Sequence, residues 1–396
     1  MVYPGREEHL KYLLAGLQKT GIPLVEFDGT QFLPAGMEDD IGMYVLIPKL
    51  TLLLNIPLSQ AITLFFNVMS YGAAGIGMLG FMHYFTTWPS RIMSILGVCA
   101  LTIATTTTTD VYRAPAAIVI ATIPWALYYL QKQTSLSRYL FLTCAGFACM
   151  IAHFIRGHSG STPAIFMVLL IIVNSYDSWR SKVISIFALV CGALPAYFYF
   201  HSCLTKYHTF IQEKLPEYAW VQVQHTFWHT IYAGMGFISN DLGLSFDDGA
   251  PHRRVEQVAP QAIRPALDPW KVPLHVSAEY ETVLRNETIA LIKRHTFYVV
   301  RVLVAKLGLL LFYLLLFAHV GLWCAWRRVI NSSLTIAFTA ALSWSALPGI
   351  LAIPNFLYLT GFISLAGMLG ILGTGILIAQ QGGYLKQHVA RLRNSF

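Results

Sequence analysis

Acidic residues occur as adjacent pairs at three places in the polar parts of this chain. The pairs are Glu7 and Glu8, Asp39 and Asp40, and Asp247 and Asp248. Two neighbouring carboxylates can hold a divalent cation such as Mg²⁺ or Mn²⁺, or one of them can act as a general base. Acids are also common at helix N-termini, where they favour the helix dipole, and Asp39 and Asp40 suit that simpler role. The sequence therefore offers candidate catalytic acids without fixing a metal site.

Ionisable side chains also gather at the predicted outer ends of hydrophobic stretches. They are Asp110, Arg113, His153, Arg156, His158, Arg301 and Lys306. Charges at membrane depth are costly, and they are usually paired or functional. Guanidinium and ammonium groups bind phosphate oxygens strongly, so this set would suit a lipid-linked phosphate, with Asp247 and Asp248 as further substrate-binding candidates. The alternative is anchoring at the lipid headgroups, which suits Arg301 better than the deeper Lys306.

These side chains belong to a strongly apolar chain. Of its 396 residues, 56% are hydrophobic and 12% are charged, and the mean hydropathy is +0.56. Soluble domains carry about 25% charged residues, and a bilayer core needs about 20 apolar residues in a row. Several stretches are that long, so we predict an all-α polytopic transmembrane helix bundle rather than a soluble enzyme. The net charge of +8 fits basic membrane loops, and no nucleic-acid-binding module is visible.

The hydrophobic stretches divide the chain into four regions. We predict membrane spans at 58–83, 91–109, 112–131, 137–155, 161–176, 183–203, 297–326, 331–350 and 355–380. The fifth is short for a span. The regions are an extracytoplasmic loop with juxtamembrane helices (1–57), a six-helix part (58–203), a large extracytoplasmic loop (204–296) and a three-helix part with a cytoplasmic tail (297–396). In the large loop, Ala278–Arg294 is predicted to be helical, and 234–275, rich in Gly, Pro and Asp, to be irregular.

Lysines and arginines are unevenly distributed between the short connections. Every second connection, and the C-terminal tail, is richer in these residues. Basic loops stay in the cytoplasm, so we predict a cytoplasmic C-terminus and place 1–57 and 204–296 on the outer side. The polar N-terminal region then crosses the membrane either unaided or behind a further helix encoded upstream of Met1. We favour the further helix, which gives ten spans in the complete protein.

Three short patterns have structural rather than catalytic explanations. Gly75–Gly80 spells GxGxxG inside an apolar stretch rather than between a strand and a helix, so it predicts close helix packing and not dinucleotide binding. Gly157–Ser161 approaches the GxSxG of serine hydrolases but lacks its last glycine and a preceding strand. The six cysteines form no CxxC pair, which argues against a disulfide framework or a zinc site.

The N-terminal residues carry a resemblance to a known group of enzymes. Pro4–Tyr12 reads PGREEHLKY and is followed by the turn at Asp28-Gly29, and Asp39–Leu50 reads DDIGMYVLIPKL. Over residues 1–75 this order resembles the first outer loop of the GT-C superfamily of membrane glycosyltransferases. In that superfamily an acidic pair follows the first transmembrane helix, and a juxtamembrane helix and a second acidic segment with prolines lead into the next one. Two differences are that both residues of the first pair are Glu here, and that Pro48 stands alone.

The resemblance implies a function. GT-C enzymes transfer a sugar from a polyprenyl-phosphate carrier on the outer side of the membrane, and an acid of the first loop acts as base or metal ligand. That role would fall on Glu7 or Glu8, with Asp39 or Asp40 second. The overall layout is also similar to that of bacterial multi-pass membrane proteins, which implies the inner membrane. The expected partners are the lipid bilayer and a lipid-linked sugar, with no nucleic acid.

Two other functions are compatible with the sequence. A transporter or flippase for a lipid-linked or anionic substrate would carry polar residues and broken helices at mid-membrane, for which Asn174 and the break at Pro348-Gly349 are candidates. A non-catalytic membrane scaffold would need none of the acids. Because the ionisable residues lie mostly at predicted outer ends of the spans, we favour glycosyl transfer.

Overall fold

In its described residues the protein is an all-α helix bundle with one very small sheet. The structure, a computed structural model, describes residues 4–33, 40–131, 135–174, 177–216, 227–247, 249–260 and 278–393. Its sheet is a two-stranded antiparallel hairpin, β1 (Glu26–Phe27) and β2 (Phe32–Leu33). In the described part of the chain, eight helices are long and apolar enough to cross a membrane. The predicted fold class, a polytopic helix bundle, is confirmed.

Two of the eight spans consist of more than one helical segment. The first joins α3, a π-helical turn η1 and α4, and the third begins with the 3₁₀ turn η2 before α6. The segments are α3 (Leu58–Asn67), η1 (Val68–Gly72), α4 (Ala73–Tyr84), α5 (Trp88–Thr106), η2 (Asp110–Arg113), α6 (Ala114–Leu130), α7 (Leu136–Ile155), α9 (Trp179–Lys214), α13 (Thr296–Trp326), α14 (Ser332–Leu351) and α15 (Thr360–Arg393).

The fifth predicted span is too short to cross a membrane by itself. Helix α8 (Ser161–Val173) has 13 residues, which at 1.5 Å per residue is about 20 Å against a hydrocarbon core of about 30 Å. It ends at Asn174, whose side-chain amide donates to the carbonyl of Leu130 at the end of α6. Of the nine predicted spans, eight are therefore long helices in the described residues, and α8 packs against α14 and α6.

Small residues allow the helices to approach closely. A Cβ on Gly77 or Gly80 of α4 would collide with Ile120 or Pro124 of α6, whereas Gly75 faces open space. The GxGxxG pattern is therefore part of a helix contact, as predicted, through two of its three glycines. Glycines also allow α7 and α9 to approach closely, because Gly146 lies against the backbone of Leu189 and Gly192 against that of Thr143.

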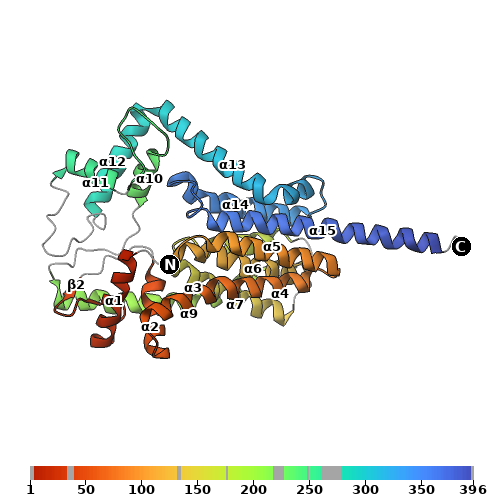
Figure 1. Cartoon of the computed structure of the whole chain (residues 1–396), viewed down its shortest axis with the longest axis horizontal. Helices are drawn as coiled ribbons and strands as arrows, with labels where there is room; N and C mark the ends of the chain where they lie inside the picture. Colours follow the sequence, from red (N-terminus) through yellow and green to blue (C-terminus); the bar gives the residue numbers. More distant parts are fainter. Residues whose placement is uncertain are drawn as a thin grey trace.

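Two groups of short elements gather at one end of the bundle. Figure 1 shows α1 (Pro4–Thr20), the hairpin and α2 (Ile41–Leu54) at the same end as α10 (Phe227–Met235), α11 (Gly249–Val258) and α12 (Ala278–Arg294), while α15 leaves the opposite end towards the C-terminus. Helix α12 has the predicted bounds. Two predictions are corrected, because α9 continues to Lys214, past the predicted boundary at 203, and 249–258 is helical rather than irregular.

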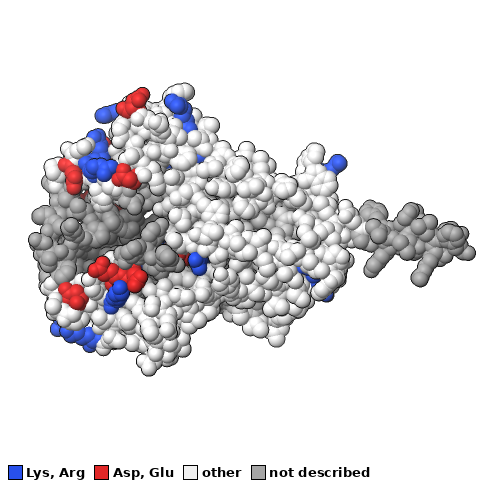
Figure 2. Space-filling view, viewed as in Figure 1, with Lys and Arg blue, Asp and Glu red and all other residues white. Residues whose placement is uncertain are grey.

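Charged residues are concentrated at the end of the bundle where these short elements gather. On the face drawn in Figure 2, the sides of the bundle are almost free of charged residues, and Lys, Arg, Asp and Glu gather at the end that carries α1 and α11–α12. A ring of apolar side chains without charge is what a bilayer core requires. The arrangement fits a multi-pass membrane protein whose charged residues, on the face drawn, are concentrated at one end.

Candidate functional site

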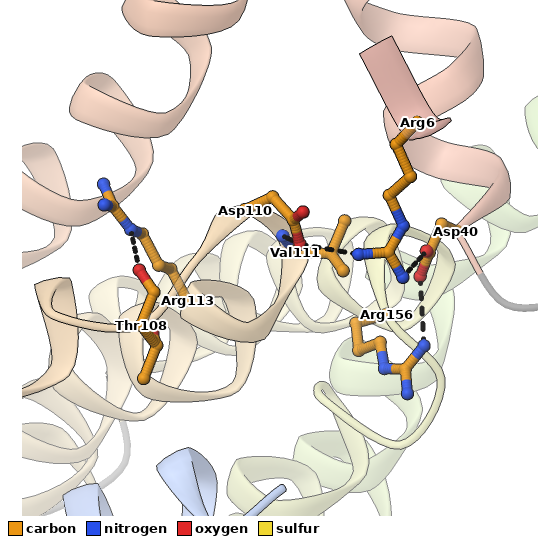
Figure 3. A network of polar contacts seen from close by, with 7 residues as sticks. All are labelled: Arg6, Asp40, Thr108, Asp110, Val111, Arg113 and Arg156. Atoms are coloured by element: carbon orange, nitrogen blue, oxygen red, sulfur yellow. Dashed lines mark hydrogen bonds and ion pairs between the residues drawn. The ribbon is translucent and has the colours of Figure 1, made fainter. Parts of the chain in front are cut away.

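Two acids and two arginines meet at the polar end of the bundle, next to α1. The Arg6 guanidinium lies between two carboxylates, with Nη2 2.7 Å from Asp40 Oδ2 and Nη1 2.8 Å from Asp110 Oδ1. Arg156 Nη1 approaches the other oxygen of Asp40 at 3.3 Å. Figure 3 shows this arrangement, which we call the acid–arginine cluster: Arg6, Asp40, Asp110 and Arg156. Its members come from α1, the residue before α2, η2 and the residue after α7.

The carboxylates of the cluster are buried. Asp110 is 1% exposed and Asp40 is 5% exposed, while the side chains of Arg6 and Arg156 are 19% and 18% exposed. Buried charges are tolerated when they are paired. Burial opposes the charge on Arg6, but Asp40 and Asp110 outweigh it, so the pKa of the Arg6 guanidinium lies above its ordinary value. The charges of the cluster therefore compensate one another, and its arginines are the members that solvent can reach.

Local geometry explains why Asp110 points into the cluster. Its φ is +35°, a left-handed conformation that Asp tolerates better than most residues because its side chain can bond locally. Here Oδ1 accepts the backbone N–H of Val111 at 2.6 Å as well as the Arg6 guanidinium. Strained backbone of this kind clusters at functional sites. Arg113 lies on the far side of η2 and donates to the carbonyls of Thr106 and Thr108 at the end of α5, away from the cluster (Figure 3).

The aromatic ring of Tyr112 contacts both arginines of the cluster. The guanidinium carbons of Arg156 and Arg6 lie 4.7 Å and 5.7 Å from the centre of its ring, within the range of a cation–π contact. The Tyr112 carbonyl accepts the hydroxyl of Thr360 at the start of α15. The cluster is thus joined to a buried helix of the bundle, which holds it in place.

A histidine–glutamate pair lies one turn further along α1. His9 Nδ1 is 2.9 Å from Glu26 Oε1 of β1. Glu26 is 2% exposed, whereas the His9 side chain is 46% exposed. The hydrogen bond that Glu26 accepts from His9 raises the pKa of His9, and burial raises the pKa of Glu26. The imidazole of the pair is therefore accessible to solvent, and the carboxyl group that binds it is buried.

The first-choice catalytic acids lie outside the cluster. Glu7 pairs with Lys11 at 3.3 Å on the exposed side of α1, and Glu8 accepts the hydroxyl of Tyr12 at 2.7 Å. Glu7 lines a shallow groove of about 390 Å³ between α1 and the start of α3. Of the second-choice acids, Asp40 is in the cluster, and Asp39 lies outside the described residues. Although Asp40 is the N-cap residue of α2, its carboxylate makes no cap hydrogen bond and faces the arginines instead.

Apart from Arg156, the predicted phosphate-binding cations lie outside the acid–arginine cluster. Lys306 is 1% exposed, and its Nζ donates to the carbonyls of Ile350 and Ala352 at 3.0 and 2.6 Å, which caps the C-terminal end of α14. Arg301 is exposed on α13. His158 follows Arg156 in the loop before α8, with a φ of +69°.

Asp247 belongs to a different part of the polar end. It lies between α10 and α11, where Ser245 donates to it and Arg253 pairs with it at 2.9 Å. These two hydrogen bonds lower the pKa of Asp247. Its neighbour Asp248 lies outside the described residues. Asp247 thus stabilises the α10–α11 connection and is not joined to the acid–arginine cluster.

Four residues of this region were not predicted as site residues: Arg6, His9, Glu26 and Tyr112. Arg6 and His9 lie three residues apart, and they share a face because the observed helix α1 begins at Pro4 and so includes both. As for metal ions, no group of three His, Cys, Asp or Glu side chains in the described part of the chain is arranged to hold one. Both carboxylates of the cluster already bind Arg6, so a metal ion would have to displace it.

No family model, curated protein or solved structure matches this chain.

Proposed function

We propose that this protein transfers a sugar from a polyprenyl-phosphate carrier to an extracytoplasmic acceptor at the acid–arginine cluster. The observation that carries the proposal is the meeting of Arg6, Asp40, Asp110 and Arg156 at one polar end of an apolar bundle. Their segments are far apart in the chain, and two carboxylates are buried there at the cost of desolvation. Buried charges at a membrane surface, which are costly to desolvate, are typical of a functional site.

The residue types suit the departure of a phosphate. In glycosyl transfer from a lipid phosphate, negative charge develops on the leaving oxygen, and guanidinium groups aimed at it lower the barrier. Arg156 would supply the positive charge. Its guanidinium would exchange the 3.3 Å contact with Asp40 for a contact with a phosphate oxygen, since guanidinium groups bind phosphate and carboxylate in the same way. Asp40 and Asp110 would hold Arg6 in place and orient the substrate.

The proposed orientation places the cluster outside the cytoplasm of a bacterial inner membrane. The N-terminal elements and α10–α12 share one end of the bundle (Figure 1), and the connections at the opposite end are the basic ones that favour the cytoplasm. The C-terminus of α15 would then be cytoplasmic.

Cysteine accessibility tests this orientation. In a background without the six native cysteines, Asp241→Cys and Ser137→Cys both introduce an exposed thiol. A membrane-impermeant maleimide added to intact cells should label position 241 and spare position 137. The reverse pattern would overturn the orientation.

Sugar transfer tests the function. Purified protein in liposomes would be given a panel of radiolabelled polyprenyl-phosphate sugars together with native membrane extract as the source of acceptor. Asp40→Asn and Asp110→Asn should abolish transfer, whereas Asp241→Asn, an exposed acid at the same polar end, should preserve it.

The rival functions predict other outcomes. A flippase would move the labelled lipid between leaflets without transferring its sugar. A scaffold would do neither, and its Asp110→Asn variant would complement a deletion as well as the native chain.

A further inference from the structure

We infer that His9, oriented by the buried Glu26, is the group that takes the proton of the acceptor hydroxyl. The inference rests on the proposed function and names the base of that same site. It differs from the expectation drawn from the sequence, which gave this role to Glu7, Glu8, Asp39 or Asp40.

The geometry of the pair is that of an oriented base. His9 Nδ1 and Glu26 Oε1 are 2.9 Å apart. With the Glu26 carboxylate as acceptor, Nδ1 carries the proton and donates it, which leaves the lone pair on Nε2 for an incoming hydroxyl. A carboxylate behind an imidazole fixes its tautomer and stabilises the imidazolium that forms. Glu26 is 2% exposed and His9 46%, so the carboxyl is sheltered and the imidazole is accessible.

The pair lies beside the cluster. Arg6 and His9 are three residues apart on α1, so their Cβ atoms are neighbours on one helix face, roughly 5–6 Å apart. The His9 ring also packs edge-on against the ring of Tyr44, with the centroids 6.4 Å apart. Tyr44 lies on the first turn of α2, four residues after Asp40. A substrate held at the arginines would therefore place its reacting carbon near His9.

The carboxylates of the cluster are poorly suited to be the base. Asp110 bonds to the Arg6 guanidinium, and Asp40 bonds to both Arg6 and Arg156. An acceptor hydroxyl that approached either carboxylate would compete with these guanidinium N–H groups for its oxygens. Glu7 and Glu8 point to the exposed side of α1 and each bonds to a side chain one turn away. His9 is the titratable group at this site whose bonds leave a nitrogen lone pair for a substrate.

The surroundings of His9 favour a proton on the imidazole. The titratable groups that face it are Glu8 from α1 itself, Glu26 from β1 and Tyr44 from α2. Both acids attract the imidazolium, and burial keeps the pKa of Tyr44 above its ordinary value, so its hydroxyl stays neutral. The imidazolium formed during the reaction is thus stabilised from two sides.

The step balances as follows. The acceptor oxygen forms a bond to the anomeric carbon as its proton moves to His9 Nε2. The bond from that carbon to the phosphate oxygen breaks, and its electron pair leaves with the polyprenyl phosphate. The His9 imidazolium then returns its proton to water. The products are the glycosylated acceptor, the polyprenyl phosphate and neutral His9.

The pH dependence of sugar transfer tests this assignment. The native protein should lose activity as the pH falls and His9 becomes protonated. His9→Gln should lower the rate at least 100-fold, whereas His201→Gln, an exposed histidine on α9, should leave it within threefold of native. Glu26→Gln should shift the acidic limb of the rate profile to lower pH, because the pKa of His9 falls without its carboxylate partner. A purely structural role for Glu26 would lower the rate at every pH and leave the limb in place.

The outcomes separate this inference from the proposed function. Transfer by the native protein, together with a His9→Gln variant within threefold of it, would overturn the role of His9 alone. An unmoved acidic limb in Glu26→Gln would overturn the role of the pair. Absence of transfer by the native protein with every donor would overturn the proposed function, and the inference with it.

Discussion

The side chains of Arg6 and Asp110 form an ion pair of 2.8 Å, although 104 residues separate them in the chain. The pair joins α1 to η2, the 3₁₀ turn with which the third span begins. Because Asp40 binds the same guanidinium, a single arginine links three segments of the polar end. Removal of that arginine should therefore disturb more than one contact.

Arg6→Gln should destabilise the protein by about 3 kcal/mol, since breaking a buried ion pair leaves its partners without compensation. Unfolding followed by tryptophan fluorescence in detergent would measure the change. Lys11→Gln is the matched control, because Lys11 pairs with Glu7 at an exposed position of the same helix, and exposed pairs contribute little. Equal stability of Arg6→Gln and Lys11→Gln would show that the cluster does not hold α1 in place.

Stability should decline as the pH rises, through His9 and Glu26. Both pKa values are raised in the folded protein, so the folded state binds these protons more tightly than the unfolded chain. Their contribution is complete below the unfolded pKa values, 4.5 for Glu26 and 6.5 for His9, and is lost as the pH rises through the folded ones.

Thermal melts at pH 6 and pH 8.5 would measure this effect. The Tm of the native protein should fall over this range, and the fall should be smaller in Glu26→Gln, which lacks the carboxylate that raises the His9 pKa. His201→Gln should keep the native slope. Parallel curves for the native protein and Glu26→Gln would contradict the coupling.

The contact between α7 and α9 should not tolerate larger residues. A Cβ at Gly146 or Gly192 would collide with the backbone of the facing helix, and overpacking of this kind costs about 1–3 kcal/mol. Gly146→Ala and Gly192→Ala should lower the Tm. Gly308→Ala on α13 is the control, because a Cβ there meets nothing within 4 Å, and alanine is the better helix former. A Tm of Gly146→Ala at or above that of Gly308→Ala would refute the close contact.

Lys306 should be needed for stability rather than for substrate. Its ammonium group donates to the carbonyls of Ile350 and Ala352, and Lys306→Met would leave these acceptors unsatisfied at a cost of about 1–3 kcal/mol. We expect a lower Tm and, for the folded protein, sugar transfer within threefold of native. Arg301→Met, exposed on the same helix, should change neither. A loss of transfer in Lys306→Met without a loss of stability would favour the phosphate-binding role instead.

The sequence was informative wherever one local property decides the structure. Long apolar runs predict long helices, and the alternating charges and apolar residues of Ala278–Arg294 predict α12 at its observed bounds. The prediction was wrong at α8, because hydropathy averaged over 161–176 passes over Asn174, which directly follows the last residue of the helix. The carboxylate of Asp177 pairs with the fully buried Arg138 at 2.6 Å, a contact that no local pattern reveals.

The site was predicted in part. Asp40, Asp110 and Arg156 stand out in the sequence because charges beside apolar stretches are unusual. Arg6 does not, since its role depends on where the first helix folds back against η2. His9 and Glu26 meet only because the chain turns between α1 and β1 and brings residues 17 positions apart into contact. Pairings of this kind follow from the tertiary fold and not from residue type or spacing.

The most direct measurement of the central claim is the rate of sugar transfer from polyprenyl phosphate by the native protein and by Asp110→Asn. Both would be assayed in liposomes with the same donor panel and acceptor extract, with Asp241→Asn as the exposed control and with Tm as a check on folding. We predict measurable transfer by the native protein and by Asp241→Asn, and a loss of at least 100-fold, about 2.7 kcal/mol in the barrier, in a folded Asp110→Asn. Equal transfer by the native protein and Asp110→Asn, or none by the native protein with any donor, would contradict the account.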